Sequence, residues 1–417
     1  MGRRAFPLVA AGMAAVALAL TACGSADEEP SSSQAATADA ATASSEQAEA
    51  SGAPIEVGGL ASLTGPFPFP DATKAAAAVF EEVNAAGGVN GHPIEYHVED
   101  DKGDPAVATQ AARSLIQQQD VVGLVSGASL LECAVNAPFY QQSGTRDVTG
   151  IGTSPQCFST PNIAPVNTGP FAGITVSMYY ASEELGHDKV CVIGNQPDGW
   201  NDALTAAVDR WSQLSGLEPA MVDFGLNATD DLTPFLLRAV KAGCQALVLE
   251  DVDFQTIAAV KAVDTQGIEG MDLLPLTTSY SEQVAEALAN SKAINSGAIR
   301  LFANSEFEPF TGDSPANEEW RALMEKHDIP LTSTAQGDYI AAKAFIAALE
   351  TIEGEPTREA VGEALENLTS FETPMMGVPY AFGPGDAHNP NQASKFVQLK
   401  DGAWEVVTPD WIVLPQD

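Results

Sequence analysis

The apolar and polar positions from residue 55 onward switch between the period of a strand and the period of a helix. Residues 55–60 alternate as a strand does, residues 71–84 carry apolar side chains at helical spacing, and residues 93–99 form a second alternating run. Gly87-Gly88 is expected to end the helix, because glycine accepts a positive φ at a helix C-terminus. Asp104-Pro105 has the residue types of an N-cap and a first helical position. The order strand, helix, strand, helix predicts the start of a doubly wound α/β domain.

The same alternation continues along the chain. The uninterrupted apolar run at 121–126 is typical of a strand that is buried on both faces. Further strands are predicted at 148–152, 189–194, 246–249 and 273–277, helices at 134–142, 171–185, 201–214, 233–242, 254–266, 281–290, 317–327, 334–353 and 358–367, and a hairpin within 396–411 that turns at Lys400-Asp401-Gly402. About 360 residues are too many for one compact core, so we expect two lobes. Lobe 1 is predicted to comprise 55–165 and 302–378, and lobe 2 to comprise 166–301 and 379–417, with crossovers near 163–167, 301–303 and 378–381.

Residues 1–23 have the features of a bacterial export signal. Arg3 and Arg4 precede an apolar run at 8–20 of about 13 residues, which is shorter than the roughly 20 needed to span a bilayer. The run ends in Leu20-Thr21-Ala22-Cys23, which resembles a lipobox. We therefore expect Cys23 to be lipidated, to become the mature N-terminus and to anchor the protein to the outer face of the cytoplasmic membrane. Arg3-Arg4-Ala5-Phe6 partly resembles a twin-arginine signal, so both the Sec and the Tat export routes remain open.

Residues 24–54 consist mainly of Ala, Ser, Thr, Gln and Glu and include no aromatic residue. Such a segment buries too little apolar surface to offset the entropy of ordering, so it is expected to be a disordered tether that spans on the order of 30 Å. The whole chain has a formal charge of −37. This charge repels nucleic acid and anionic lipid, so neither is expected as a partner.

Five cysteines leave an even number once Cys23 is set aside, which favours disulfides in an exported protein. Cys133 and Cys157 flank one helix–strand unit and are expected to pair. Cys191 and Cys244 lie in or beside two predicted strands, where either a disulfide or two free buried thiols would fit.

The sequence contains no arrangement that predicts catalysis, a metal site or a cofactor. It has no Gly-x-Ser-x-Gly elbow and no Walker loop, and the partial dinucleotide pattern at 150–155 has proline in place of its third glycine. The five histidines, His92, His97, His187, His327 and His388, have no zinc-ligand spacing, and the acidic run at 100–104 does not match a calcium loop. We therefore expect a binding protein rather than an enzyme.

Three pieces of the chain carry a family resemblance. Ser62-Leu63-Thr64-Gly65-Pro66, the helix end at 84–94 and the run at 100–105 before an alanine-rich helix look like the opening of type I periplasmic binding proteins. The similarity is greatest to the leucine/isoleucine/valine-binding branch, the solute receptors of ABC importers. It implies two doubly wound parallel-sheet lobes joined by a three-stranded hinge, a monomer that closes on a small-molecule ligand, and a membrane permease as partner.

The loops that follow the strands carry the candidate ligand-binding residues, since ligands of parallel α/β domains bind beyond the carboxyl ends of the strands. The resemblance places Thr153 and the backbone of Ile151 and Gly152 where the family holds a ligand carboxylate, and either Ser129 or Leu130 at the family's serine position. It places Phe67 or Phe69 at an aromatic wall and Trp200 at the position of a stacking tyrosine. The candidate residues are Phe67, Phe69, Ser129, Leu130, Ile151, Gly152, Thr153, Trp200, Asp251, Thr277 and Thr278.

The ligand class depends on where an acidic residue lies. Thr277 and Thr278 occupy the position of the acid that pairs with an α-ammonium group in the family, and Glu250, Asp251 or Asp253 could replace it. If one of them does, the ligand is an amino acid; otherwise an amide, a urea-like solute or a small organic acid fits better. An importer receptor is the favoured function, and a ligand-sensing ectodomain on the same fold and an extracytoplasmic enzyme are the alternatives.

Overall fold

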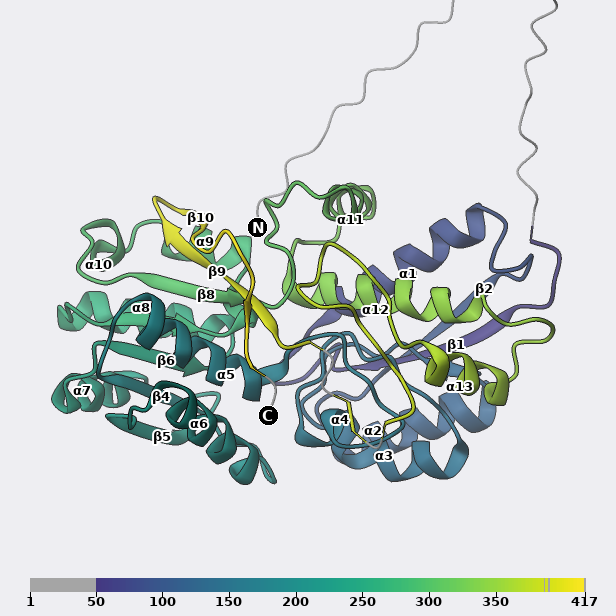
Figure 1. The fold of residues 1–417 in the computed structure, drawn as a ribbon, viewed down its shortest axis with the longest axis horizontal. Coiled ribbons are helices and arrows are strands. Elements are labelled where there is room, and N and C mark those ends of the chain that lie inside the picture. Colours follow the sequence, from purple (N-terminus) through teal and green to yellow (C-terminus); the bar gives the residue numbers. More distant parts are fainter. Residues whose placement is uncertain (1–49, 386, 389–390, 416–417) are drawn as a thin grey trace, which may run out of the picture. The chain divides into compact units, whose positions relative to one another are not determined.

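Two sheets of mostly parallel strands organise the computed structural model, which describes residues 50–385, 387–388 and 391–415 (Figure 1). The smaller sheet has the strand order β2-β1-β3, and the larger, eight-stranded sheet has the order β10-β9-β8-β7-β6-β4-β5 with β11 paired to β9. The predicted α/β class is confirmed. The predicted export signal, the lipidated Cys23 and most of the predicted tether lie outside the described residues.

The smaller sheet begins with the strands predicted at the start of the chain. Strand β1 (Ile55–Ala61) pairs in parallel with β2 (Ile94–Asp100) and with β3 (Gly123–Leu124). The strand predicted at 148–152 is reduced to a short ladder in which the N–H groups of Val148 and Gly150 donate to the carbonyls of residues 124 and 126. The ladder ends there because the next N–H on the same side, that of Gly152, donates to the side chain of Asn167 instead of to a strand carbonyl.

Helices cover both faces of the smaller sheet. Helices α1 (Pro70–Ala85) and α12 (Ser333–Leu349) lie against each other on one face, and α2 (Pro105–Arg113) and α3 (Glu132–Ser143) on the other (Figure 1). The remaining helical elements of this part are η1 (Ser114–Gln118), α4 (Pro155–Phe158), α11 (Pro315–Lys326) and α13 (Arg358–Asn367). Asp104 caps α2 as predicted, since its side chain accepts from the N–H groups of residues 106 and 107. We call the smaller sheet with these helices lobe 1.

The larger sheet and its helices form lobe 2. Its strands are β4 (Val190–Asn195), β5 (Met221–Leu226), β6 (Ala246–Glu250), β7 (Asp272–Pro275), β8 (Leu301–Ser305), β9 (Ala393–Lys400), β10 (Ala403–Val406) and β11 (Ile412–Val413). Its helical elements are α5 (Gly169–Tyr179), η2 (Tyr180–Glu184), α6 (Asn201–Ser215), α7 (Thr233–Ala242), α8 (Asp253–Gln266), η3 (Thr277–Ser279), α9 (Glu282–Leu288) and α10 (Lys292–Asn295). Sequence analysis predicted most of these elements but not β5, an edge strand.

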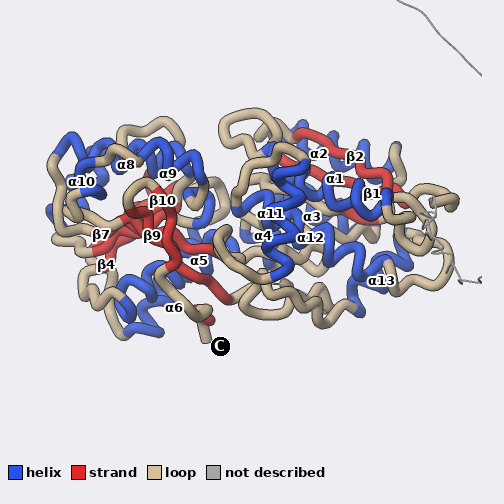
Figure 2. Tube along the Cα trace, turned by 90° about the horizontal axis from the view of Figure 1, so that it is seen from above, coloured by secondary structure: helices blue, strands red, loops and turns tan. Residues whose placement is uncertain are grey.

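The central strands of lobe 2, β4, β6, β7 and β8, are buried on both faces. On β4, Val190 and Val192 pack with α5 and α6, whereas Cys191 and Ile193 pack on the opposite side with α7 and α8. Figure 2 shows α8, α9 and α10 on one side of this sheet and α6 on the other. The hairpin of β9 and β10 turns where predicted, and Asp401 and Gly402 have φ values of 51° and 78°.

The strand pairing of β8 bears on one of the predicted lobe boundaries. Residues 302–305 were assigned to lobe 1, but they belong to β8, which pairs with β7 through Leu301↔Leu273 and with β9 through Ala303↔Val397. The chain returns to lobe 1 only after Ser305. The backbone pairing of β8 therefore places the residues that follow it at the carboxyl edge of the larger sheet.

Two disulfides close loops within the lobes. Cys133 and Cys157 pair as predicted. Cys191 and Cys244 also pair, with 5.8 Å between their Cα atoms. Two cysteines within adjacent strands of a sheet are poorly placed for a disulfide. Cys244 precedes β6 rather than lying within it, so this difficulty does not arise here. Within the described part of the chain, no helix is long and apolar enough to cross a membrane.

Candidate functional site

A narrow cavity of about 70 Å³ lies where the carboxyl ends of strands from both lobes meet. We call it the inner cavity. Its lining residues are Phe69, Ala128, Leu130, Ile151, Gly152, Thr153, Asn167, Gly169, Pro170, Gly173, Trp200, Glu250, Asp251, Val252, Leu276, Thr277, Thr278, Asn304, Glu306 and Thr334. Several of them lie at or directly after the carboxyl end of a strand, which is the position where parallel α/β folds bind ligands.

Most of the predicted site residues come together here. Phe69, Leu130, Ile151, Gly152, Thr153, Trp200, Asp251, Thr277 and Thr278 all line the inner cavity. Phe67 and Ser129 do not. Phe67 instead stacks on the ring of Phe254 from lobe 2, with 6.1 Å between the ring centroids.

The hydroxyl of Ser129 is already hydrogen-bonded within lobe 1. It donates to the buried carboxylate of Asp101 and accepts from the N–H groups of Leu131 and Glu132 at the start of α3, at 3.2 and 3.0 Å. This leaves Leu130 as the cavity-lining residue of the pair that sequence analysis could not separate. The Thr153 hydroxyl donates to the Ser129 carbonyl, so this loop is tied to its neighbour.

Two lining groups that were expected to contact a ligand also hold the fold. The N–H of Gly152 donates to Asn167 Oδ1 at 2.8 Å, and Asn167 Nδ2 donates back to the Gly152 carbonyl at 3.1 Å. Trp200 is only 3% exposed and packs edge-on against Phe171, 5.3 Å between centroids. Trp200 therefore belongs to the core of lobe 2 and forms a wall of the inner cavity at the same time.

Buried carboxyl groups dominate the polar part of the lining. Glu250, Asp251 and Glu306 all line the inner cavity, and its described lining contains no lysine, arginine or histidine. Burial raises the pKa of Glu250 and of Asp251 well above their ordinary values, and it raises the pKa of Glu306 to about 7. Desolvation disfavours the charged form of each acid, and no lining cation opposes it.

The acids at the end of β6 are held by neighbours on lobe 2. Glu250 accepts from the N–H of Asn195 at 2.8 Å. Asp251 accepts from the Thr256 hydroxyl at 2.8 Å, and its carbonyl accepts from the Thr278 hydroxyl at 3.0 Å. Thr278, which sequence analysis placed at the family's acid position, thus supports the backbone of the neighbouring acid.

Sequence analysis missed Asn304 and Glu306 at the end of β8. Both side-chain atoms of Asn304 are buried without a hydrogen-bond partner among the described residues, and so is Oε2 of Glu306. Oε1 of Glu306 accepts from the N–H of Gly169 at 2.9 Å. The signal that could have found them is a pair of polar residues at alternate positions, 304 and 306, continuing the face of an otherwise apolar strand.

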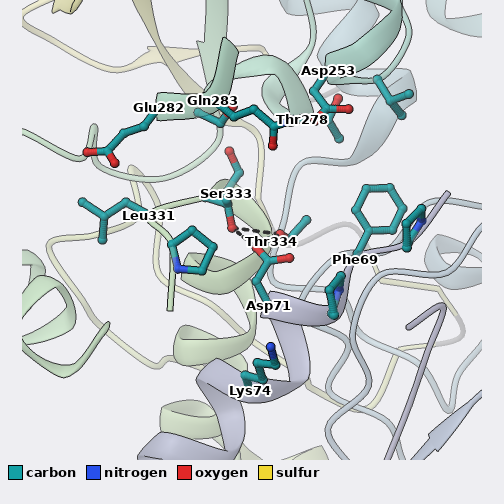
Figure 3. A pocket seen from close by; sticks show the side chains of 16 residues that line it. Phe69, Asp71, Lys74, Asp253, Thr278, Glu282, Gln283, Leu331, Ser333 and Thr334 are labelled. Atoms are coloured by element: carbon teal, nitrogen blue, oxygen red, sulfur yellow. Dashed lines mark hydrogen bonds between the residues drawn. The ribbon is translucent and has the colours of Figure 1, made fainter. Parts of the chain in front are cut away.

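A second, larger cavity of about 300 Å³ adjoins the first; we call it the outer cavity. The two share Phe69, Val252, Thr278 and Thr334. Figure 3 shows Thr278 and Glu282 of lobe 2 facing Asp71 and Lys74 of lobe 1. Its remaining lining residues are Pro68, Pro70, Asp253, Ser281, Gln283, Pro330, Leu331, Thr332 and Ser333. Because the two cavities share these residues, they are direct neighbours.

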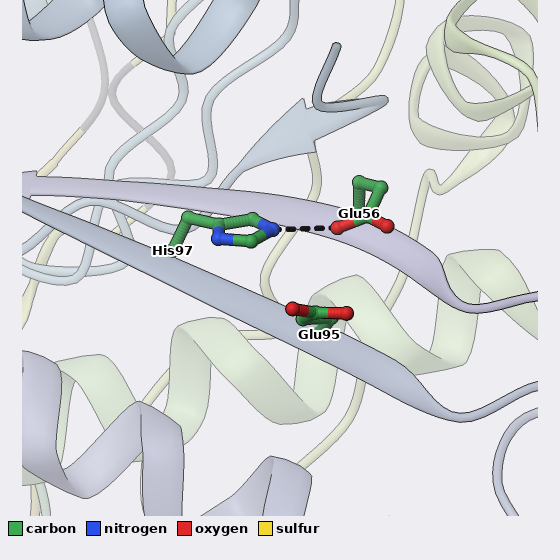
Figure 4. A group of neighbouring side chains, drawn as sticks. All are labelled: Glu56, Glu95 and His97. Carbon is green, nitrogen blue, oxygen red and sulfur yellow. Dashed lines mark hydrogen bonds and ion pairs between the residues drawn. The ribbon is translucent and has the colours of Figure 1, made fainter. Parts of the chain in front are cut away.

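The described residues also contain one group of side chains whose ligand atoms are close enough to hold a metal ion: Glu56, Glu95 and His97 on β1 and β2 (Figure 4). His97 Nε2 already lies 2.5 Å from a Glu56 carboxylate oxygen, and Glu95 is exposed. This group lies on β1 and β2 and does not line the inner cavity. The His97–Glu56 pair accounts for its geometry without an ion.

Comparisons with known proteins agree with this architecture. The family model described as periplasmic binding protein matches residues 54–403. A leucine-, isoleucine-, valine-, threonine- and alanine-binding protein of Pseudomonas aeruginosa is 26% identical over 325 residues, which are 75% of this chain and 82% of that protein.

Several solved structures have the same fold. The fatty acid ABC transporter substrate-binding protein from Thermomonospora curvata has a TM-score of 0.72 at 19% identity, covering 87% of this chain and 93% of its own. A solute-binding protein from R. palustris in complex with 4-hydroxybenzoate has a TM-score of 0.72 at 18% identity, with 86% and 97% covered. The isoleucine-bound substrate binding protein of a branched-chain amino acid transporter from Streptococcus pneumoniae has a TM-score of 0.69 at 16% identity, with 86% and 99% covered.

Proposed function

We propose that this chain, which belongs to the periplasmic binding protein family because that family's model spans residues 54–403, is the extracytoplasmic solute-binding protein of an ABC importer. It delivers a small ligand, bound between its lobes, to a membrane permease. Lipidation of Cys23 would keep the protein near that permease, and we expect it to act as a monomer. The ligand we propose carries a positively charged amine.

The observation that carries the ligand class is the charge of the inner cavity. Glu250, Asp251 and Glu306 line it, and its described lining holds no basic side chain. A cation that enters would restore the charged form of these acids, since an opposite charge within about 4–6 Å favours ionisation. A solute whose only charge is a carboxylate offers these acids no counter-charge and would disfavour their charged forms still further. The lining therefore favours an amine or an amino acid over an organic acid.

The binding step follows from the contacts between the lobes. Thr277 Oγ1 of lobe 2 donates to Ser333 Oγ of lobe 1 at 2.8 Å, and the rings of Phe67 and Phe254 stack across the same boundary. A ligand that touches both lobes adds to these contacts only when the lobes are closed. It thereby shifts the population toward the closed form, which is the hinge motion we propose for delivery.

The test is a binding screen with ligands that differ by one charged group. The mature chain, freed of bound ligand by unfolding and refolding, would be titrated with L-leucine, with its decarboxylated amine 3-methylbutylamine, and with its deaminated acid 4-methylpentanoic acid. The panel would also hold other amino acids, amines, fatty acids and 4-hydroxybenzoate. We expect binding to be confined to compounds with an amine. Tight binding of acids that lack an amine would refute the ligand class, and no binding by any solute would refute the receptor function.

Variants of the lining locate the site. Asp251→Asn should weaken binding of the best ligand about tenfold or more, because a hydrogen bond to a charged group is worth about 1.5–3 kcal/mol. Thr153→Ala and Trp200→Ala should also weaken it. Glu218→Gln, at an exposed glutamate in a lobe 2 loop, is the matched control. If all three lining variants bind as the control does, the ligand does not occupy the inner cavity.

A further inference from the structure

We propose that the ligand has hydrogen-bond donors at both ends, and that Asn304 and Glu306 recognise the end that the acids of β6 do not reach. This inference rests on the proposed function and refines it. The observation behind it is a pair of side chains with buried polar atoms that lack a partner: both amide atoms of Asn304 and one carboxylate oxygen of Glu306. Among the described residues, only Asn304 and Glu306 both line one of the cavities above and have a buried side-chain nitrogen or oxygen without a hydrogen-bond partner.

Their burial makes these atoms significant. Asn304 is 1% exposed and Glu306 is 2% exposed, so bulk water does not satisfy them. Buried polar groups in folded proteins almost always have a partner, and each exception calls for an explanation. A side chain that lines a cavity at the carboxyl end of a parallel strand has a direct explanation, because a ligand bound in the cavity can supply the missing hydrogen bonds.

The order of the strands separates these groups from the other acids. Strand β7 lies between β6, which leads into Glu250 and Asp251, and β8, which leads into Asn304 and Glu306. Neighbouring strands are about 4.8 Å apart, so the two strand ends are roughly 10 Å apart. Leu276, which follows β7, also lines the inner cavity and contributes an apolar side chain to the stretch between them. The acids that follow β6 and the pair at the end of β8 therefore lie at two separate ends of the lining, with Leu276, Thr277 and Thr278 between them.

A glycine keeps the β8 end accessible. Gly173 on α5 lines the inner cavity, and a Cβ built there would lie 3.5 Å from Leu276 Cδ2 and 3.8 Å from Asn304 Nδ2. A Cβ there would sit in ordinary van der Waals contact with the amide of Asn304, and glycine leaves this side of the amide uncovered.

The chemistry of the two side chains defines the group they accept. Asn304 offers a carbonyl acceptor and an amide donor, and Glu306 offers a carboxylate acceptor. An ammonium, amidinium, guanidinium or urea group can donate to both acceptors. A methyl or isopropyl group would leave all these atoms unsatisfied, and a site built for hydrogen bonds strongly rejects a ligand that lacks them. The inference therefore predicts selection against leucine, isoleucine and valine in favour of ligands with two polar ends.

The decisive measurement compares ligands that differ at one end. Isothermal titration would use L-ornithine, L-citrulline and L-norvaline, which share the α-amino acid end, and 1,4-diaminobutane against butylamine. We expect the donor-ended member of a pair to bind at least about tenfold more tightly. Binding of norvaline and butylamine as tight as that of their donor-ended partners would overturn the inference, although the receptor function would stand.

A second measurement needs no ligand. Asn304→Leu replaces an unsatisfied amide by an apolar group of similar size, so the unliganded variant should unfold at the same temperature as the wild type or at a higher one. The control is Asn317→Leu. Asn317 is fully buried and its amide donates to the carbonyls of Pro309 and Gly312, at 2.9 and 3.1 Å, so this variant should unfold at a lower temperature. If Asn304→Leu loses as much stability as Asn317→Leu, the amide of Asn304 is already satisfied and the inference fails.

Discussion

Replacing Glu306 by glutamine should remove a defined part of the pH dependence of stability. Burial raises the pKa of this carboxyl to about 7 from an ordinary value of 4.5. Between these values the folded protein keeps a proton that the unfolded chain has already released. The contribution of this neutral carboxyl to the unfolding free energy is therefore fully present below pH 4.5 and is lost as the pH rises toward about 7.

The size of the effect follows from the same two values. One pH unit of difference between folded and unfolded pKa is worth about 1.36 kcal/mol, so the ionisation of Glu306 costs the unliganded wild type about 3 kcal/mol of unfolding free energy above pH 7. Glutamine has the same shape and retains an oxygen that can accept from the N–H of Gly169, but it does not ionise. As the pH rises from acid to mildly alkaline values, the unfolding free energy of Glu306→Gln should therefore increase by about 3 kcal/mol relative to that of the wild type.

The assay is urea unfolding, followed by tryptophan fluorescence, of the wild type, Glu306→Gln and Glu218→Gln at a series of pH values from about 4.5 to about 8. The control variant should change in parallel with the wild type. The reasoning is refuted if the Glu306→Gln curve is also parallel to the wild type, because the carboxyl would then be ionised in the fold at an ordinary pKa. A cationic ligand adds a corollary: it should bind the wild type more tightly as the pH rises through about 7 and should release a proton on binding below that pH.

Two further predictions concern the lobes themselves. Gly150→Ala should lower the unfolding free energy by at least about 2 kcal/mol, because a Cβ there would lie 1.8 Å from a side-chain oxygen of Asp338 and 2.7 Å from its backbone nitrogen. Gly362→Ala within α13 should instead raise the unfolding free energy by up to about 1 kcal/mol, because its Cβ would meet nothing closer than 3.8 Å. Urea unfolding of both variants checks this pair of predictions. Replacing Cys191 and Cys244 together by alanine should lower the unfolding free energy by about 4 kcal/mol, since their disulfide closes a loop with a sequence separation of 53; equal stability of the oxidised wild type and the variant would contradict this.

The elements that sequence analysis predicted best are those with local signals. Helix α7 (Thr233–Ala242) and helix α13 (Arg358–Asn367) begin and end where their apolar spacing and terminal residues indicated. Strand β5 was missed because it lies at an edge of the larger sheet, and Val222 on it is 45% exposed. An edge strand that is half buried has no continuous apolar run, so its pattern is weak.

The site was predictable in outline because the rule for parallel sheets refers to strand ends, and strand ends can be found from sequence. The strand-end rule pointed to the loops that hold Thr153, Trp200 and Asp251, the family resemblance singled out Thr153 and Trp200 within them, and all three line the inner cavity. Asn304 and Glu306 were not predicted, because their position depends on which sheet β8 joins. That choice is made by pairing with β7 and with β9, and β9 lies almost a hundred residues further along the chain. No local pattern encodes a pairing of that range.

Burial alone does not mark a ligand-binding carboxyl in this protein, and neither does a missing partner. Asp147 is fully buried and its pKa is raised to about 6, yet it accepts from the N–H of Ser126 and from the hydroxyl of Thr149 within the core of lobe 1. Asp338 has two unpartnered oxygens but lines none of the cavities above. Glu306 differs from both because one of its carboxylate oxygens lacks a partner and the residue also lines the inner cavity. A ligand in the inner cavity can supply the missing partner of Glu306, whereas Asp338 does not line that cavity, so the two acids should respond differently when the cavity is filled.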